Sequence, residues 1–358
     1  MTKTILILGA GWAGLPLAHK LLKYTVPKLQ GDPRIILVSP NTHFYWNVAA
    51  TRGVIPGAIP DDQLFLSIEE GFARYPPANF EFVLGKAEGI DLKSNSVMVA
   101  TNSGTQRSVG YDHLVIATGS RIRSNLPFKP VGAHEETLAA LHSLQKQIEV
   151  AKSIVIAGAG PTGVETAGEI AAAYRGEKEV TLIISGERVL QSSEVRVDVS
   201  LGVEKDLQKL GVILLRNVQV KEVQEKEEGD SQTSLKLSDD AGDLNLEKSM
   251  RVSGTQNVWG IGDVGNIEAK QLTVTDAQII HLSSVLDSVL TGKGDDKKEY
   301  KPSPKTMVFI SLGKKLAIGQ IGDWRLWGWM VSYVKGRKLF VDTARGYVDG
   351  KHLRHASM

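Results

Sequence analysis

Residues 4–14 read TILILGAGWAG, and this stretch decides the fold. Its first half is an apolar run that predicts a buried strand, and the apolar residues after it recur with helical spacing. Gly9 permits a sharp turn off the strand, Gly11 lets the backbone approach a pyrophosphate, and Gly14 lets helix and strand pack closely. A second apolar run at 34–38 completes a strand–loop–helix–strand unit, which is a mononucleotide-binding unit.

The same pattern returns at residues 153–163, which read SIVIAGAGPTG. Gly158, Gly160 and Gly163 repeat the glycine spacing, and we expect a helix at 164–174 and a further strand at 180–184. One such loop is weak evidence, because a turn between a strand and a helix can contain glycines by chance. Two complete copies predict an α/β protein with two Rossmann-like dinucleotide-binding domains.

Two further strand ends carry residues suited to a flavin. Ala117, Thr118 and Gly119 follow an apolar run, and small residues there let a strand end pass close beneath an isoalloxazine ring. Gly262 and Asp263 end another expected strand, where the Asp263 carboxylate can accept a hydrogen bond from the ribityl hydroxyls. With the glycine loops, these features predict FAD as the bound cofactor.

The composition limits what else the chain can do. A net charge of +2 does not indicate a nucleic-acid surface, and the sequence contains no cysteine, so electrons must travel on a bound organic cofactor. No apolar stretch reaches the ~18 residues that cross a bilayer, and the run at 5–8 is interpreted as a strand, not a signal peptide. His352 and His355 lack a third ligand, so no metal is expected. The prediction is a cytoplasmic protein.

The order GAGWAG, YDHLVIATGS, GAGPTGVETAGE, NVWGIGD resembles the apoptosis-inducing-factor-like group of FAD-dependent pyridine nucleotide oxidoreductases, with its ferroptosis-suppressor quinone reductases and type II NADH dehydrogenases. THFYWNVAA at 42–50 and YVKGRKLF at 333–340 are similar to fungal members. The resemblance implies FAD on the first unit, NAD(P)H on the second, and transfer of electrons to a quinone or another small acceptor. Glu165 and Lys335 match positions that face the flavin, and we expect them to pair in a dry site as the catalytic residues.

The expected cofactor contacts follow from these motifs. For FAD they are Gly9, Gly11, Trp12, Ala13, Gly14, Ser39, Asn47, Ala117, Thr118, Gly119, Gly262 and Asp263, and for NAD(P)H they are Gly158, Gly160, Thr162, Gly163 and Arg188.

Three departures from the family pattern bear on the nucleotides. Ser39 stands where an acidic residue commonly holds the adenosine ribose of the first dinucleotide. The acidic residue that selects NADH is also absent after the strand at 180–184, and Arg188 there favours NADPH. Finally, the chain runs from 235–242 almost directly to Met250, which is short of the family by one supersecondary unit, on the order of thirty residues. This shortening predicts a weakened NAD(P)H site.

The expected architecture resembles that of glutathione reductase. An FAD-binding domain is formed by residues 1–120 and 250–300, a shortened NAD(P)H-binding-type domain by 121–249, and a C-terminal α+β domain by 301–358.

Two rival functions stay open at this point. The shortening favours an FAD enzyme that has lost nicotinamide use, such as an oxidase or a non-redox cyclase or isomerase of a small molecule. The tryptophans at 324–329 favour a flavin-dependent interaction protein, with peripheral membrane contact or a homodimer contact. The sequence leaves the acceptor, the choice between NADH and NADPH, and the oligomeric state undetermined.

Overall fold

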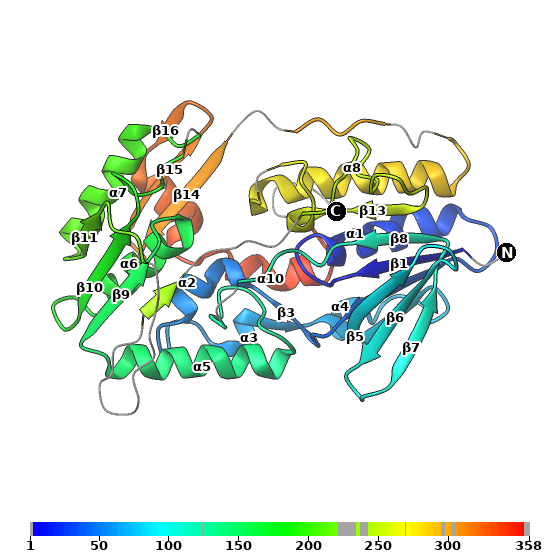
Figure 1. Ribbon diagram of the computed structural model, residues 1–358, viewed down its shortest axis with the longest axis horizontal. Coiled ribbons are helices and arrows are strands. Elements are labelled where there is room, and N and C mark those ends of the chain that lie inside the picture. Colours follow the sequence, from blue (N-terminus) through cyan, green and yellow to red (C-terminus); the bar gives the residue numbers. More distant parts are fainter. Residues whose placement is uncertain are drawn as a thin grey trace.

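A computed structural model describes residues 3–122, 125–192, 194–220, 234–236, 243–268, 270–294, 298–302 and 306–353. Two β-sheets, each with helices against it, form the two ends of the molecule in Figure 1. The long helix α5 (His134–Val150) runs along one side between them. The fold is the α/β class predicted from the two glycine loops, which is therefore confirmed.

The larger sheet has seven strands in the order β13-β8-β1-β2-β5-β6-β7. β13, β8, β1, β2 and β5 are parallel to one another, whereas β5, β6 and β7 form an antiparallel meander at one edge. The strands are β1 (Thr4–Leu8), β2 (Arg34–Ser39), β5 (Phe80–Asp91), β6 (Ser96–Thr101), β7 (Gln106–Gly110), β8 (His113–Ile116) and β13 (Val258–Gly260).

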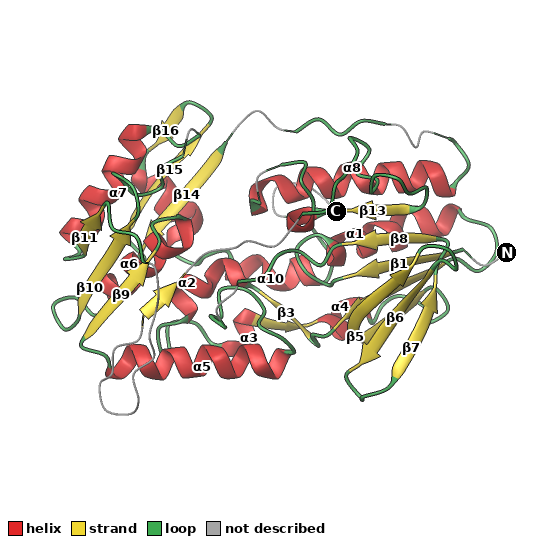
Figure 2. Cartoon of the chain, in the orientation of Figure 1, coloured by secondary structure: helices red, strands yellow, loops and turns green. Residues whose placement is uncertain are grey.

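Helices cover this sheet because its central strands are apolar on both faces. Ile5, Leu6 and Ile7 of β1 have no exposed surface. α1 (Gly14–Lys20) continues into the π-helical turn η1 (Leu21–Thr25) and the short η2 (Val26–Lys28), and it packs beside α8 (Leu272–Leu290). Figure 2 shows these helices lying along the strands.

Short elements follow β2 and lead towards the second sheet. They are β3 (His43–Tyr45), η3 (Asn47–Ala49), α2 (Ala50–Gly53), α3 (Asp61–Leu64), β4 (Phe65–Ser67) and α4 (Ile68–Phe72), and η4 (Gly262–Val264) follows β13.

The second sheet has four parallel strands in the order β11-β10-β9-β12. They are β9 (Ser153–Ala157), β10 (Glu179–Ile184), β11 (Ile213–Arg216) and β12 (Ser234–Lys236), with α6 (Pro161–Ala173) and α7 (Val197–Lys209) alongside. Strand order reverses at β9, and such a reversal is where doubly wound sheets bind ligands. The polar stretch 224–231, expected as a hairpin tip, lies outside the described residues.

The C-terminal part of the chain contacts both ends of the molecule. β14 (Met307–Leu312), β15 (Leu316–Ile321) and β16 (Trp324–Leu326) form an antiparallel sheet that packs against α6 and α7. α9 (Gly328–Val331), η5 (Ser332–Gly336) and α10 (Val341–Val348) then return the chain to the first sheet, as the red segment of Figure 1 shows. The Trp46 indole donates to the Leu339 carbonyl over 3.0 Å, and the Tyr347 hydroxyl donates to the Trp12 carbonyl over 2.7 Å.

The strands expected at 34–38 and 180–184 are β2 and β10, and α6 begins at Pro161, three residues before the expected helix start at 164. Within the described part of the chain, no helix is long and apolar enough to span a bilayer.

Candidate active site

The three sequence motifs of the first dinucleotide site meet where β1, β8 and β13 end. A Cβ built on Gly9 would lie 2.5 Å from the Ala117 carbonyl oxygen, and one on Gly262 would lie 3.2 Å from the Ala13 Cβ. A Cβ on Gly14 would lie 1.9 Å from the Gly9 carbonyl oxygen. Residues from the glycine loop, the ATGS strand end and the Gly-Asp turn are therefore in close contact, as the sequence predicts.

The middle glycine has different surroundings, and these fit a bound dinucleotide. Apart from its two chain neighbours, no heavy atom of the described residues lies within 4 Å of a Cβ built on Gly11. Gly9 and Gly14 are required for packing within the protein, whereas Gly11 leaves open room on the side where a pyrophosphate would approach. The loop thus fits FAD.

Asp263 has two partners that the sequence analysis did not identify. Its Oδ2 accepts a hydrogen bond from the Ser120 hydroxyl over 2.9 Å and lies 3.1 Å from the Lys129 ammonium. Lys129 also donates to the Ser120 hydroxyl. The Lys129 ammonium compensates the carboxylate charge at the end of β13 while Asp263 keeps part of its surface exposed.

Trp12 and Asn47 support the glycine loop from the side. The Trp12 indole donates to the Asn47 Oδ1 over 2.7 Å, and the Asn47 amide donates to the Phe128 carbonyl over 3.0 Å. The Trp12 ring also packs against the rings of Phe44, Trp46 and Tyr347. Ser39 is buried at the end of β2, where its hydroxyl accepts the Asn41 amide over 3.1 Å.

The second glycine loop repeats the geometry of the first. Gly158 has a φ of +113°, and a Cβ on Gly163 would lie 2.0 Å from the Gly158 carbonyl oxygen. A Cβ on Gly160 would meet no atom within 4 Å, as at Gly11. α6 starts at Pro161 directly after the loop, so its free backbone N–H groups face the same side. Thr162 is partly buried in its first turn.

Arg188 follows β10, in a segment that is hydrogen-bonded to this second loop. The Leu190 amide, two residues on, donates to the Ala159 carbonyl in the loop over 2.8 Å. The Arg188 Nε is buried and has no hydrogen-bond partner among the residues that the structure describes. A buried guanidinium nitrogen without a partner suits an anionic ligand.

Glu165 and Lys335 form the predicted ion pair. The Lys335 Nζ lies 2.6 Å from the Glu165 Oε1, and the two residues are only 9% and 6% exposed. Ser311 donates to the same Oε1 from its backbone amide over 2.9 Å and from its hydroxyl over 3.2 Å, while Lys335 also donates to the Phe309 carbonyl over 2.7 Å. Neither residue is therefore an exposed surface charge.

A second buried ion pair lies one helical turn further along α6. Arg52 donates from Nε and Nη2 to the two carboxylate oxygens of Glu169, each over 2.8 Å. Burial raises the pKa of Glu169, although the Arg52 guanidinium acts to lower it. The sequence analysis missed this pair. The sequence signal for it is a helix of small and apolar residues that contains two glutamates four positions apart. Such a helix is expected to be buried, and buried carboxylates need cations from other parts of the chain.

No group of three or more His, Asp or Glu side chains suited to a metal occurs among the described residues. His352 contacts the Leu353 carbonyl through Nδ1 over 3.1 Å, and His355 lies outside the described residues.

The paired glycine loops, the small-residue strand ends and the parallel strands that carry them in both sheets define a dinucleotide-dependent flavoprotein. Residues 3–282 match the family model described as pyridine nucleotide-disulphide oxidoreductase, and the chain belongs to this family. It is an FAD-dependent NAD(P)H oxidoreductase, which confirms the cofactors and the enzyme class expected from the sequence.

Its relatives include fungal and vertebrate proteins. Oxidoreductase ptaL of Pestalotiopsis fici is 34% identical over 377 residues, which cover 98% of this chain and 100% of ptaL. Ferroptosis suppressor protein 1 of Homo sapiens is 26% identical over 381 residues, which cover 95% of this chain and 94% of that protein. Both alignments are longer than this chain of 358 residues, so both relatives contain residues that it lacks.

Solved structures have the same fold. NDH2 from Plasmodium falciparum, in complex with NADH, has a TM-score of 0.75 over 97% of each chain at 14% identity. The sulfide:quinone oxidoreductase of Aquifex aeolicus has a TM-score of 0.74 over 96% of this chain and 92% of that chain at 18% identity. These identities support the fold alone.

Proposed function

We propose that this chain passes electrons from NAD(P)H through FAD to a quinone-like acceptor, which is reduced beside the Glu165–Lys335 pair. The observation that carries the proposal is this ion pair of 2.6 Å, buried between α6 and η5. Bound FAD would supply the redox chemistry, accepting a hydride from the nicotinamide and returning two electrons to the acceptor. The sequence contains no cysteine, so no disulphide within it can carry these electrons.

The protein's part in this reaction is to bind, orient and supply a proton. A quinone that takes up two electrons also takes up two protons, and its oxygens become strong hydrogen-bond acceptors as charge develops. The Lys335 ammonium is a donor in a site from which water is largely excluded, and the Glu165 carboxylate is its counter-charge. The Ser311 amide and hydroxyl in turn hold the carboxylate of Glu165.

We also propose that FAD and NAD(P)H contact the residues expected from the sequence motifs. The open room at Gly11 and at Gly160 supports one dinucleotide on each loop. The Nε of Arg188, which has no partner among the described residues, supports NADPH over NADH. Replacing Gly160 by Ala should weaken NADPH binding without loss of FAD, which a titration of the yellow protein would measure. The domain division at residues 120, 249 and 300 is likewise kept as a proposal.

The helix formed by α9 and η5 supports an apolar acceptor and a peripheral membrane contact. Its outer face exposes Trp329, Met330, Tyr333 and Val334, whereas its inner face buries Val331, Ser332, Lys335 and Gly336. A helix that buries its charge and exposes its apolar side chains is the reverse of a water-facing helix. Such a face suits the interface of a bilayer, where tryptophan and tyrosine are favoured.

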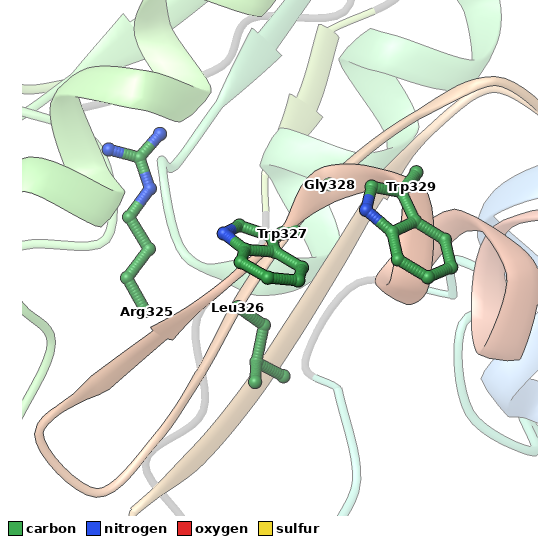
Figure 3. Close-up of a pocket in the computed structure, with 5 residues that line it drawn as sticks. All are labelled: Arg325, Leu326, Trp327, Gly328 and Trp329. Carbon is green, nitrogen blue, oxygen red and sulfur yellow. The ribbon is translucent and has the colours of Figure 1, made fainter.

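An open groove of about 750 Å³ lies beside this helix, lined by residues 325–329. Figure 3 shows the Trp327 and Trp329 rings, 6.3 Å apart at their centroids, while Arg325 points away from them. Arg325 lies 3.7 Å from Asp198 of α7, which fixes its charge away from the tryptophans. The groove therefore offers mainly aromatic surface to a lipid chain or to an apolar acceptor.

Two variants test the acceptor site. Lys335→Met and Glu165→Gln should leave flavin reduction by NADPH within about threefold of the wild-type rate and slow reoxidation by a short-chain ubiquinone by about tenfold or more. Lys338→Met is the matched control, because Lys338 is an exposed lysine paired with Asp342. Unchanged reoxidation in both variants would refute the proposal.

The membrane contact has a separate test. The protein should float with vesicles of phosphatidylcholine and phosphatidylglycerol, and Trp327→Ser with Trp329→Ser should abolish flotation. Tyr24→Ser, at another exposed aromatic side chain, is the control. If the wild type stays unbound to vesicles and instead sediments as a dimer that the tryptophan variant dissociates, the surface is a homodimer contact.

A further inference from the structure

Arg52 connects three parts of the chain that are far apart in sequence. It lies in α2, its carboxylate partner Glu169 lies on α6, and it also contacts the end of η5. Its Nη2 donates to the Gly336 carbonyl over 2.7 Å, and its Nη1 donates to the Arg337 carbonyl over 3.1 Å. These two carbonyls directly follow Lys335.

The guanidinium is buried, with 3% of the residue exposed. It donates four hydrogen bonds, two to the Glu169 carboxylate and two to backbone carbonyls. One side binds the Glu169 carboxylate in a bidentate manner, and the other side holds the backbone that ends η5. A lysine could not form this set, because its ammonium is a single point with three donors. The contact is therefore specific to arginine.

Two buried carboxylates on α6 are four residues apart, and each needs a cation. Glu165 has Lys335, and Glu169 has Arg52. Without Arg52, Glu169 would be a buried carboxylate with no counter-charge, and the nearby ammonium of Lys335 would be the cation available to it. The backbone that carries Lys335 would lose its two hydrogen bonds at the same time.

We infer that Arg52 is a positioning residue for the acceptor site: it holds the end of η5 and neutralises Glu169, so that Lys335 pairs with the carboxylate of Glu165 and not with that of Glu169. This inference rests on the proposed role of Lys335. Arg52 itself touches neither substrate nor cofactor in this account, and it acts through Lys335.

The first readout is the chemical accessibility of Lys335, which does not depend on turnover. Brief acetylation of the FAD-loaded protein, followed by mass spectrometry, should label Lys335 slowly in the wild type. In Arg52→Met the labelling rate should rise by about tenfold, as for a side chain released from a buried pair. Lys178, held by the carbonyls of Glu149 and Ala151, is the internal control and should keep its rate.

The second readout separates the two half-reactions. In Arg52→Met, reoxidation by a short-chain ubiquinone should fall by about tenfold, whereas reduction by NADPH should stay within about threefold. Arg216→Met is the matched control, because it removes an arginine from the Glu204 pair on α7, also 2.8 Å long. It should change neither readout. If Arg52→Met does not fold, Arg52→Lys takes its place. This variant keeps the positive charge but loses the planar guanidinium, so Lys335 labelling should still rise and reoxidation should still fall.

The outcomes are distinguishable from failure of the proposed function. If Lys335→Met leaves reoxidation unchanged, the acceptor site itself is wrong. If Lys335→Met slows reoxidation but the Arg52 variants leave both Lys335 labelling and reoxidation at wild-type values, the positioning role is refuted. A parallel rise in Lys178 labelling, with both half-reactions slowed equally, would also refute it, because that pattern indicates general loosening.

Discussion

At the scale of single residues, the three glycines of each dinucleotide loop have three different surroundings. The first adopts a φ that other residues avoid, and the third is in contact with the carbonyl of the first. A Cβ added to the middle one would meet no described residue beyond its chain neighbours within 4 Å. The spacing of the glycines, which the sequence itself shows, predicts that each loop binds a dinucleotide. Their distinct roles follow only from the structure, because they depend on what lies beside each Cα.

This difference gives a paired prediction for the first loop. Gly14→Ala should destabilise the protein by about 1–3 kcal/mol, since its Cβ would lie far inside contact distance of the Gly9 carbonyl. Gly11→Ala should leave the melting temperature of the FAD-free protein unchanged and weaken FAD binding by about tenfold or more. Flavin fluorescence titration measures the affinity. Wild-type affinity in Gly11→Ala would mean that the pyrophosphate does not approach there.

His19 provides a prediction for pH. Burial lowers its pKa from 6.5 to about 3, and its ring stacks on Phe72 while contacting the Tyr75 hydroxyl and the Val348 carbonyl. Because the folded pKa lies below the unfolded one, the unfolded chain binds the proton first. Stability is therefore full above pH 6.5 and falls as the pH drops below it, by up to about 1.4 kcal/mol per unit.

The measurement is the melting temperature at pH 7.5 and at pH 5, in the wild type and in His19→Asn. Acidification should lower the melting temperature of the wild type more than that of His19→Asn, because the variant lacks this proton uptake. Equal losses in both proteins would show that His19 is not held neutral.

At the scale of elements, α6 begins in the second glycine loop and carries the two buried carboxylates of the proposed acceptor site. Gly168 lies between Glu165 and Glu169, and a Cβ there would lie 2.5 Å from the Leu312 Cδ2 and 2.9 Å from its Cα. This close approach brings β14 against α6, so that Ser311 reaches Glu165. The sequence shows the glycine, but the strand against it is more than a hundred residues away.

Gly168→Ala should destabilise the protein by about 1–3 kcal/mol and slow reoxidation by quinone more than reduction by NADPH. The reason is that β14 must move away from α6, which lengthens the Ser311–Glu165 hydrogen bonds. Gly89→Ala is the control, since a Cβ there meets no atom within 4 Å. A fully stable Gly168→Ala with normal reoxidation would contradict the packing described for this helix.

At the scale of the whole molecule, the strand–loop–helix units and their order could be predicted from sequence, because periodicity and glycine spacing are local. The Glu165–Lys335 pair was anticipated only through resemblance to a family. The Arg52–Glu169 and Lys129–Asp263 pairs were missed because their partners lie 117 and 134 residues apart. Neither local pattern nor composition indicates which distant charges meet.

The nucleotide-binding end of the molecule also has a feature that the shortened sequence did not suggest. β12 pairs with β9 in parallel, so β9 has a strand on each side and the strand order reverses at its glycine loop. The shortening expected between 235–242 and Met250 stays a prediction, and so does its effect on NAD(P)H binding.

The most direct test is to mix the purified yellow protein anaerobically with NADPH, and separately with NADH, and then with a short-chain ubiquinone. We expect the flavin to be bleached, faster by NADPH, and ubiquinone to restore its colour. A bleaching rate in the ordinary range of ~1–1,000 per second would show that the shortened segment is not needed for reduction. A flavin that stays oxidised with both nucleotides, or a reduced flavin that ubiquinone does not reoxidise, would contradict the account.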